Sequence, residues 1–248
     1  MKLETPQFIG MVGRSRSGKD TVANYLIQRY GFVRMACADK LKKIISRAYH
    51  VPLDHFYLDE FRYVPHKNLN GDFMRTGEPY LQRGYESILE ELSPKTINTP
   101  PDVACREIFV NLLSGRNYSP IEAAQLIGTE GFRRHVNDGV WVDYLMAEAS
   151  SKLDAGKSVV VSDVRFENEF DLIQENGGEM WAIKRSTYRA SNHESEKHID
   201  RLSARADIAI ANNSTMELLH LLIDAHIGVS AFQQEPVASA SLQEVATP

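Results

Sequence analysis

The sequence predicts an α/β fold in which a mostly parallel, five-stranded sheet carries helices on both faces. Two observations lead to this fold class. Short apolar segments typical of buried strands alternate along the chain with segments whose apolar residues recur at helical spacing. The first strand and the first helix are joined by a glycine-bounded loop that has the spacing of a phosphate-binding loop.

The composition is that of an ordinary globular protein. The chain has 248 residues, of which 43% are hydrophobic and 25% are charged, so it can bury a large core. The net charge of −5 gives no reason to expect a nucleic-acid-binding surface, and small anions would need local clusters of arginine. The two cysteines, Cys37 and Cys105, lack the spacing of a disulfide framework or a cysteine metal site.

No apolar run approaches the roughly 18–20 residues of a membrane span, and the N-terminus lacks the basic-then-apolar pattern of a signal peptide. We therefore expect a cytoplasmic protein that binds neither nucleic acid nor a membrane.

The loop from Gly13 to Thr21 follows the apolar run Phe8–Val12 and leads into a helix that ends near Gly31. This order of strand, loop and helix is the context that a phosphate-binding P-loop needs. The backbone N–H groups of the loop would face an anion, and Lys19 would add a full positive charge for the outer phosphates. We expect the whole loop to bind the phosphates of ATP: Gly13, Arg14, Ser15, Arg16, Ser17, Gly18, Lys19, Asp20 and Thr21.

Asp20 departs from the usual P-loop pattern, which has Ser or Thr at this position to hold Mg²⁺. A carboxylate beside a triphosphate is repelled unless a cation lies between them, so we expect Asp20, with Thr21 behind it, to contact Mg²⁺ or a metal-bound water. The alternative is a chance match in a loop that binds nothing, which the correct strand before and helix after the loop disfavour.

A short second strand is predicted at 32–36, and the next helix begins at Ala38 and Asp39, on the ligand side of an open α/β sheet. From Pro52 to Pro101 the pattern is irregular, with aromatic, charged, proline and glycine residues mixed. We interpret this segment as an insertion that covers a site, and a peripheral structural excursion is an equally open alternative.

Helical spacing returns at 102–113, and Ser119 with Pro120 signals the start of another helix that would stop at Gly128–Thr129. Arg133 and Arg134 follow, before a helix at about 139–153 that contains Trp141. The two arginines could clamp a phosphate, although adjacent arginines more often form a solvated face.

The run S-V-V-V-S-D at 158–163 is the strongest buried-strand signal after the first strand, because a continuous β-branched run indicates a strand covered on both faces. Asp163 therefore lies at the same edge of the sheet as the P-loop, and Arg165 and Glu169 follow it. A triphosphate cradle, a carboxylate and a guanidinium are the groups that phosphoryl transfer requires.

A fourth strand is predicted at 179–184, followed by Arg185 and Arg189 in a polar stretch. This stretch suits a lid that reaches over phosphates, with a solvated loop equally open. After a fifth strand at 206–211, Ser214 and Glu217 form a capping box for a last helix that ends at about 227–228.

We expect a single domain over residues 1–228, with the insertion at about 52–101 and the lid-like segment at about 185–203. Residues 229–248, which are rich in Ala, Ser, Gln and Pro and have no periodicity, are predicted to form a disordered tail. A zinc site at His193 and His198 is disfavoured, because no third ligand stands at metal-binding spacing.

The motifs also have a fixed order along the chain: G-K-D-T at 18–21, A-D with L-K at 38–42, L-I-G-T-E at 126–130, W-V at 141–142, S-D-V-R with Glu169 at 162–169, and A-N-N-S at 211–214. Together they resemble the deoxynucleoside monophosphate kinases of large tailed bacteriophages over about residues 7–228. The resemblance implies a three-layer P-loop kinase fold with the strand order 2-3-1-4-5 and an inserted helical region that covers the substrate.

The resemblance implies that the protein transfers the γ-phosphate of ATP to deoxynucleoside monophosphates of several bases, with Mg²⁺ as cofactor. Such an enzyme works in the cytoplasm of the infected bacterial host and supplies phage DNA synthesis. Its partners would be the nucleotides alone, and a homodimer is compatible with the sequence.

By the same resemblance, Lys19 would stabilise the transferring phosphoryl group, beside the metal contact Asp20. Asp163 and Arg165 would serve the acceptor or the reaction centre, with Glu169 supporting them. Gly128, Thr129 and Trp141 would line the acceptor site. One departure from the family pattern is that Ile121 and Glu122 stand where relatives carry a basic residue, so the acceptor phosphate needs another clamp, for which the candidates are Arg133, Arg75 and Arg185.

Two other functions are open at this point. One is a kinase of a different small acceptor, such as dephospho-coenzyme A, because the turn at 212–214 and the helix that follows it also occur there. The other is a P-loop NTPase that acts as a switch or motor. The acidic charge balance, the absence of a separate effector domain and the arginine-bearing lid segment argue against this second alternative.

Overall fold

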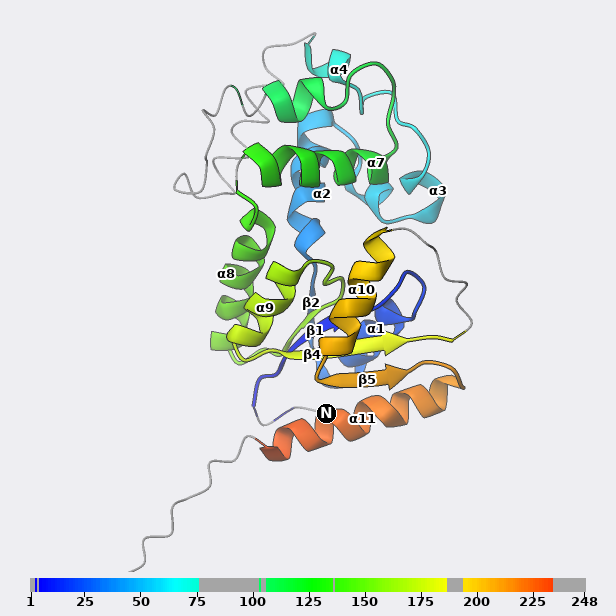
Figure 1. Ribbon diagram of the computed structural model, residues 1–248, viewed down its shortest axis with the longest axis vertical. Helices are drawn as coiled ribbons and strands as arrows, with labels where there is room; N and C mark the ends of the chain where they lie inside the picture. The colour runs from blue at the N-terminus through cyan, green and yellow to red at the C-terminus, as the bar shows by residue number, and fades with distance from the viewer. Residues whose placement is uncertain are drawn as a thin grey trace, which may run out of the picture.

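The computed structural model of the chain describes residues 3, 5–75, 103, 106–135, 137–186 and 194–233. Its five strands form one parallel sheet in the order β2-β3-β1-β4-β5 (Figure 1). The strands are β1 (Phe8–Val12), β2 (Val33–Met35), β3 (Val159–Val161), β4 (Glu179–Lys184) and β5 (Ile208–Ala211). Both the predicted parallel sheet and the order 2-3-1-4-5 are confirmed.

Helices connect the strands and extend the molecule beyond the carboxyl ends of the strands (Figure 1). The α-helices are α1 (Lys19–Tyr30), α2 (Cys37–Tyr49), α3 (Asp59–Arg62), α4 (Gly71–Arg75), α7 (Pro120–Gln125), α8 (Val140–Asp154), α9 (Glu167–Glu175), α10 (Glu194–Arg205) and α11 (Met216–Gln233). A 3-10 helix, η1 (Leu53–Phe56), and two π-helical segments, η3 (Glu107–Asn111) and η4 (Leu126–Arg133), complete the described elements. None of these helices is long and apolar enough to cross a membrane.

The two faces of the sheet belong to two apolar clusters, because successive side chains of a strand point to opposite faces. On β1, Ile9 and Met11 pack with α1 and α11, whereas Phe8 and Val12 pack with the larger cluster that includes α2, α8, α9 and α10. The central strand is therefore buried on both sides, as its continuous apolar sequence predicts. The predicted helices on both faces are confirmed.

The parallel register brings the functional loops to one edge of the sheet. Gly10 of β1 pairs with Val161 of β3, and Val12 pairs with Ala182 of β4. The segments that follow these strands, including the P-loop and Asp163, therefore leave the sheet side by side. This is the edge at which open α/β sheets bind ligands.

Several predicted helix ends are confirmed. Gly31 ends α1 in a left-handed conformation with φ 75°. Ser119 is the N-cap of α7, with Pro120 as its first residue, and Ser119 forms a reciprocal capping box with Glu122. The Glu122 carboxylate, which interrupts the expected basic pattern, thus has a local structural role.

Other boundaries differ from the prediction. The helix at α7 does not stop at Gly128–Thr129 but continues as η4 to Arg133, because buried apolar contacts of Ile127 and Phe132 override the local preference of glycine. The predicted polar lid is helical from Glu194 onwards. Its buried side chains Ile199 and Leu202 join the larger apolar cluster, on the side where α10 contacts β1 and β4, a tertiary contact that the polar sequence hides.

The last helix begins one residue later than the predicted capping box requires. Leu218 N–H donates to Thr215 Oγ1 at 3.4 Å, so Thr215 rather than Ser214 contacts the first turn. The helix also runs to Gln233 instead of ending at 227–228. The predicted insertion is described only as far as Arg75, and the rest of it, like residues 234–248, lies outside the described residues.

Candidate functional site

The P-loop is fixed to the ends of β4 and β5 by contacts that only glycine permits. A Cβ on Gly13 would lie 2.5 Å from the Ile183 carbonyl oxygen, and a Cβ on Gly18, which has φ +103°, would lie 2.1 Å from Asn212 Nδ2. The same Asn212 amide donates to the Ser17 carbonyl at 2.9 Å. Asn212 therefore holds the loop from the other end of the chain, where the sequence motif indicated no such role.

Lys19 folds back over the P-loop. Its Nζ donates to the carbonyl oxygens of Gly13 at 2.7 Å and Arg14 at 2.9 Å. The Ser17 hydroxyl is buried inside the loop without a hydrogen-bond partner in the described part of the chain. A bound phosphate would offer both groups strong acceptor oxygens.

Arg14 connects the P-loop to α10. Its guanidinium donates through Nε to Asp200 Oδ1 at 3.0 Å and through Nη2 to the other carboxylate oxygen. The Arg14 guanidinium lowers the pKa of Asp200. The described part of the lid-like segment is thus in contact with the phosphate loop. Of the two arginines predicted after β4, Arg185 is exposed and Arg189 lies outside the described residues.

Asp20 is open to solvent in the first turn of α1, with 84% of its side chain exposed, and its nearest basic group is Arg34 Nη2 at 3.7 Å. Thr21 beside it is half-buried. Within the described ranges no three His, Cys, Asp or Glu side chains gather into a metal cage. Mg²⁺ does not require one, because it is usually held by one or two carboxylates, the substrate phosphates and water. An accessible carboxylate beside the phosphate loop therefore fits this ion.

Asp163 lies at the end of β3 in an environment that disfavours its charge. Its Oδ1 atom is buried and has no hydrogen-bond partner among the described residues. Burial, followed by repulsion from Glu169, raises the pKa of Asp163 to about 7, while Arg165 and Lys42 act in the opposite direction. A carboxylate held near its neutral form and left unpaired is typical of a functional position.

Three residues near Asp163 were not predicted as site residues. The Tyr57 hydroxyl donates to Asp39 Oδ1 at 2.8 Å, and Lys42 Nζ lies 3.9 Å from the same oxygen and 4.1 Å from the centre of the Tyr57 ring. Burial lowers the pKa of Lys42. The position of Asp39 after a strand was a usable signal, but Tyr57 lies in the irregular insertion, where the sequence has no pattern that relates it to Asp39.

Glu169 is the buried support of the site. Its Oε2 accepts the N–H groups of Arg165 at 2.9 Å and Phe166 at 3.2 Å, and its Oε1 accepts Arg133 Nη2 at 2.8 Å. Only 3% of its side chain is exposed. Glu169 thus fixes the backbone between Asp163 and α9.

Arg133, a predicted phosphate clamp, already has several partners. Its guanidinium lies against Glu169, 3.6 Å from Asp138 Oδ1 and 3.8 Å above the centre of the Phe166 ring, and 8% of its side chain is exposed. The neighbouring Arg134 is exposed. A role for Arg133 at the acceptor phosphate stays a prediction, and the side chain of Arg75 lies outside the described residues.

Gly128 and Trp141 hold η4 against α8. Trp141 Nε1 donates to the Gly128 carbonyl at 3.1 Å, and its buried indole packs 4.8 Å from the Phe132 ring. A Cβ on Gly128 would lie 2.5 Å from Leu41 Cδ2, so this glycine allows α2 to approach closely. The neighbouring Thr129 is exposed.

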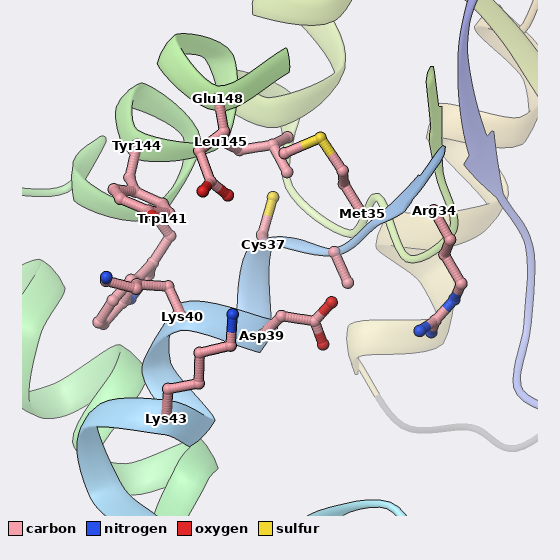
Figure 2. A pocket seen from close by; sticks show the side chains of 11 residues that line it. Arg34, Met35, Cys37, Asp39, Lys40, Lys43, Trp141, Tyr144, Leu145 and Glu148 are labelled. Carbon is pink, nitrogen blue, oxygen red and sulfur yellow. The ribbon is translucent and has the colours of Figure 1, made fainter. Parts of the chain in front are cut away.

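A small cavity of about 110 Å³ lies beside the first turn of α2, against α8 (Figure 2). Lys40 extends into it, with its Nζ 4.6 Å from the centre of the Tyr144 ring. Figure 2 shows the Asp39 carboxylate pointing the other way, toward Arg34. Asp39 and Arg34 are both among the lining residues, so the cavity borders the Asp39 end of the cluster.

A larger open hollow of about 540 Å³ lies between η4, the start of α9 and α10. This volume is in the range of small-molecule sites. Its lining includes Thr129, Arg133, Arg134, Phe166, Asn168 and His198. His198 precedes Asp200 by two residues on α10, so this one helix borders both the hollow and the P-loop.

The chain is similar in sequence to deoxynucleotide monophosphate kinases. The family model described as deoxynucleotide monophosphate kinase matches residues 7–77. A protein of Acanthamoeba polyphaga mimivirus, provisionally named deoxynucleotide monophosphate kinase, is 29% identical over 211 residues, which cover 84% of this chain and 90% of that protein. The predicted resemblance to deoxynucleotide monophosphate kinases is thus confirmed, whereas the bacteriophage origin stays a prediction.

Among solved structures, a dephospho-CoA kinase from Campylobacter jejuni matches with a TM-score of 0.44 and 14% identity, over 95% of this chain and 100% of that chain. A match of this strength supports no statement about the acceptor.

The raised pKa of Asp163 predicts a pH-dependent gain in stability for Asp163→Asn. Between the ordinary pKa of 3.8 and the folded value of about 7, the folded protein binds more protons than the unfolded chain, so its free energy of unfolding falls as the pH rises through this window. The variant lacks this titration. We expect its stability relative to the wild type to be greater at pH 8 than at pH 5 by on the order of 2 kcal/mol, as measured by urea unfolding.

Asp54→Asn, which removes an exposed carboxylate of η1, is the control for the loss of one acidic side chain. An equal effect of Asp163→Asn at pH 5 and pH 8 would contradict the raised pKa.

Proposed function

We propose that this chain, a nucleoside monophosphate kinase by its similarity to deoxynucleotide monophosphate kinases, transfers the γ-phosphate of ATP to deoxynucleoside monophosphates. The observation that carries the proposal is that α10 borders both the P-loop, through Asp200, and the hollow, through His198. A two-substrate transfer needs two such sites within reach of one another. Asp163 and Arg165 lie on the segment that leads to the hollow.

In the donor half, the loop from Gly13 to Thr21 binds the ATP phosphates through its backbone N–H groups. The ammonium of Lys19 exchanges the carbonyls of Gly13 and Arg14 for the oxygens of the transferring phosphoryl group. Asp20 and Thr21 would hold Mg²⁺, which neutralises phosphate charge when it is bound. The Asn212 contact keeps the loop in its binding conformation.

In the acceptor half, the hollow receives the deoxynucleoside monophosphate. Its phosphate lies toward Asp163, where the positive charges of Arg165 and Lys42 lower the pKa of that carboxyl group. Thr129 and the exposed Arg134 border the same hollow, and Arg185 remains a candidate from the lid side. Gly128, Trp141 and Glu169 do not contact the acceptor in this proposal. They hold the groups that line the hollow in position.

The motif resemblance extends the proposal to the biological setting. The enzyme supplies precursors for phage DNA synthesis in the cytoplasm of an infected bacterial host. It binds nucleotides as its partners, folds as one domain over residues 1–228 with an inserted segment at 52–101, and is compatible with a homodimer.

An acceptor panel tests the proposed function directly. ADP formation from ATP and Mg²⁺ is followed in a coupled assay with dAMP, dGMP, dCMP or dTMP added singly, and with no acceptor. We expect at least one deoxynucleotide to raise turnover well above the acceptor-free rate. Stimulation by dephospho-coenzyme A alone would identify a different acceptor, and turnover that ignores every acceptor would contradict a kinase function.

Lys19→Ala should lower kcat by roughly 100- to 1000-fold, because it removes a preorganised charge from the transition state. Steady-state kinetics with the best acceptor measure this change, and circular dichroism checks that the variant is folded. Lys67→Ala, at an exposed position of the insertion, is the control. Near-normal activity of Lys19→Ala would show that the loop does not hold the transferring phosphate.

Asp20→Asn should raise the Mg²⁺ concentration required for half-maximal activity severalfold, because a neutral amide oxygen binds the ion more weakly than a carboxylate. The measurement is a magnesium titration of the initial rate at fixed ATP. Asp59→Asn is a matched control, since Asp59 is also an exposed helix-start carboxylate, 3.5 Å from an arginine. An unchanged titration for Asp20→Asn would remove Asp20 from the metal site.

A further inference from the structure

We propose that Phe166 is the platform on which the base of the acceptor nucleotide stacks, and that it determines acceptor affinity without selecting a particular base. This inference rests on the proposed function. In the sequence, Phe166 stands at helical spacing in an apolar stripe with Phe170 and Ile173. In the structure Phe170 and Ile173 are fully buried, whereas Phe166 is only half-buried and lines the hollow.

The Phe166 ring is held in place by Arg133, which also lines the hollow. The Arg133 guanidinium lies 3.8 Å from the ring centre, and a cation at this distance covers one aromatic face. Arg133 is itself fixed by the buried carboxylate of Glu169, which also accepts the Phe166 N–H at 3.2 Å. The His198 ring centre lies 6.4 Å from the Phe166 ring centre at an interplanar angle of 59°, so His198 does not stack flat on the ring, and a further planar group would stack on the face that Arg133 does not cover. A ring fixed in this way needs little ordering when a ligand binds.

The position of the ring along the chain suits a nucleotide whose phosphate lies at the reaction centre. Phe166 follows Asp163 by three residues, and three extended residues span at most about 10–11 Å. The base and the phosphate of one nucleotide can therefore contact Phe166 and the vicinity of Asp163 together.

Stacking also explains how one site would accept several bases. Every base has a π-face, so stacking on an aromatic side chain is worth a similar amount for each of them. The polar side chains that line the hollow include the acidic Glu130, Asp138 and Glu167 beside Thr129, Asn168 and His198, so the lining presents both hydrogen-bond donors and acceptors. This mixed rim has no single base-specific pattern.

The test measures acceptor and donor kinetics of the full chain with Phe166→Ala, Phe166→Leu and Phe166→Tyr. Loss of the ring should raise the KM for all four deoxynucleotides alike by about 5- to 150-fold, the equivalent of one base–aromatic stack, with the KM for ATP unchanged. Phe166→Leu keeps the apolar volume without a π-face and should behave like Phe166→Ala. Phe166→Tyr should stay close to the wild type.

Tyr118→Leu is the matched control, because the Tyr118 ring also carries an arginine, Arg116, at 4.1 Å but lies outside the hollow. It should leave both KM values unchanged. Binding of the 2-aminopurine deoxynucleoside monophosphate supplies a second readout, since stacking on the ring should quench its fluorescence in the wild type and in Phe166→Tyr but not in Phe166→Leu.

The outcomes separate this inference from the proposed function. Acceptor-independent turnover of the wild type contradicts the kinase function itself. An active wild type whose acceptor KM and probe quenching are unchanged in Phe166→Leu contradicts the stacking platform alone. If Phe166→Ala fails to fold, Phe166→Leu and Phe166→Tyr decide the question. An effect on one base only would also overturn the inference, because it would indicate base selection at the ring.

Discussion

The buried carboxylate of Glu169 joins segments of the chain that are distant in sequence. It accepts the guanidinium of Arg133 from η4 and the N–H groups of Arg165 and Phe166 at the start of α9, and the Cys37 thiol of α2 donates to it as well. Burial alone raises the pKa of Glu169, and these donors oppose the shift. A buried charge is tolerated when its hydrogen bonds are satisfied, so the same contacts that stabilise Glu169 also fix the residues around the hollow.

In the donor half, two positively charged side chains of the phosphate loop already have partners within the protein. Arg14 pairs with the Asp200 carboxylate, and Lys19 donates hydrogen bonds to loop carbonyls. A triphosphate would compete for both groups. Asp200 lies on α10, the helix that also borders the hollow. The Arg14–Asp200 ion pair therefore links the phosphate loop to the position of α10.

Strands and helix ends could be predicted well where the sequence has regular apolar spacing or a capping residue. The strand at 179–184 coincides with β4, and the Ser119 cap lies where its pattern indicates. The π-helical continuation through Gly128 could not be predicted, because it depends on packing against Leu41 and Trp141. The helix α10 could not be predicted either, because the residues that stabilise it lie on α9 and the P-loop.

Local periodicity and spacing were enough to predict the alternation of strands and helices, the parallel sheet, and a phosphate loop with Asp163 at the same edge. Three contacts emerge only from the packed fold: Arg133 covers a face of Phe166, Tyr57 and Lys42 meet at Asp39, and Arg14 pairs with a carboxylate 186 positions away. The reason is that these contacts join side chains from separate elements. Their distances depend on how the helices pack on the sheet, and no local pattern of residues contains that information.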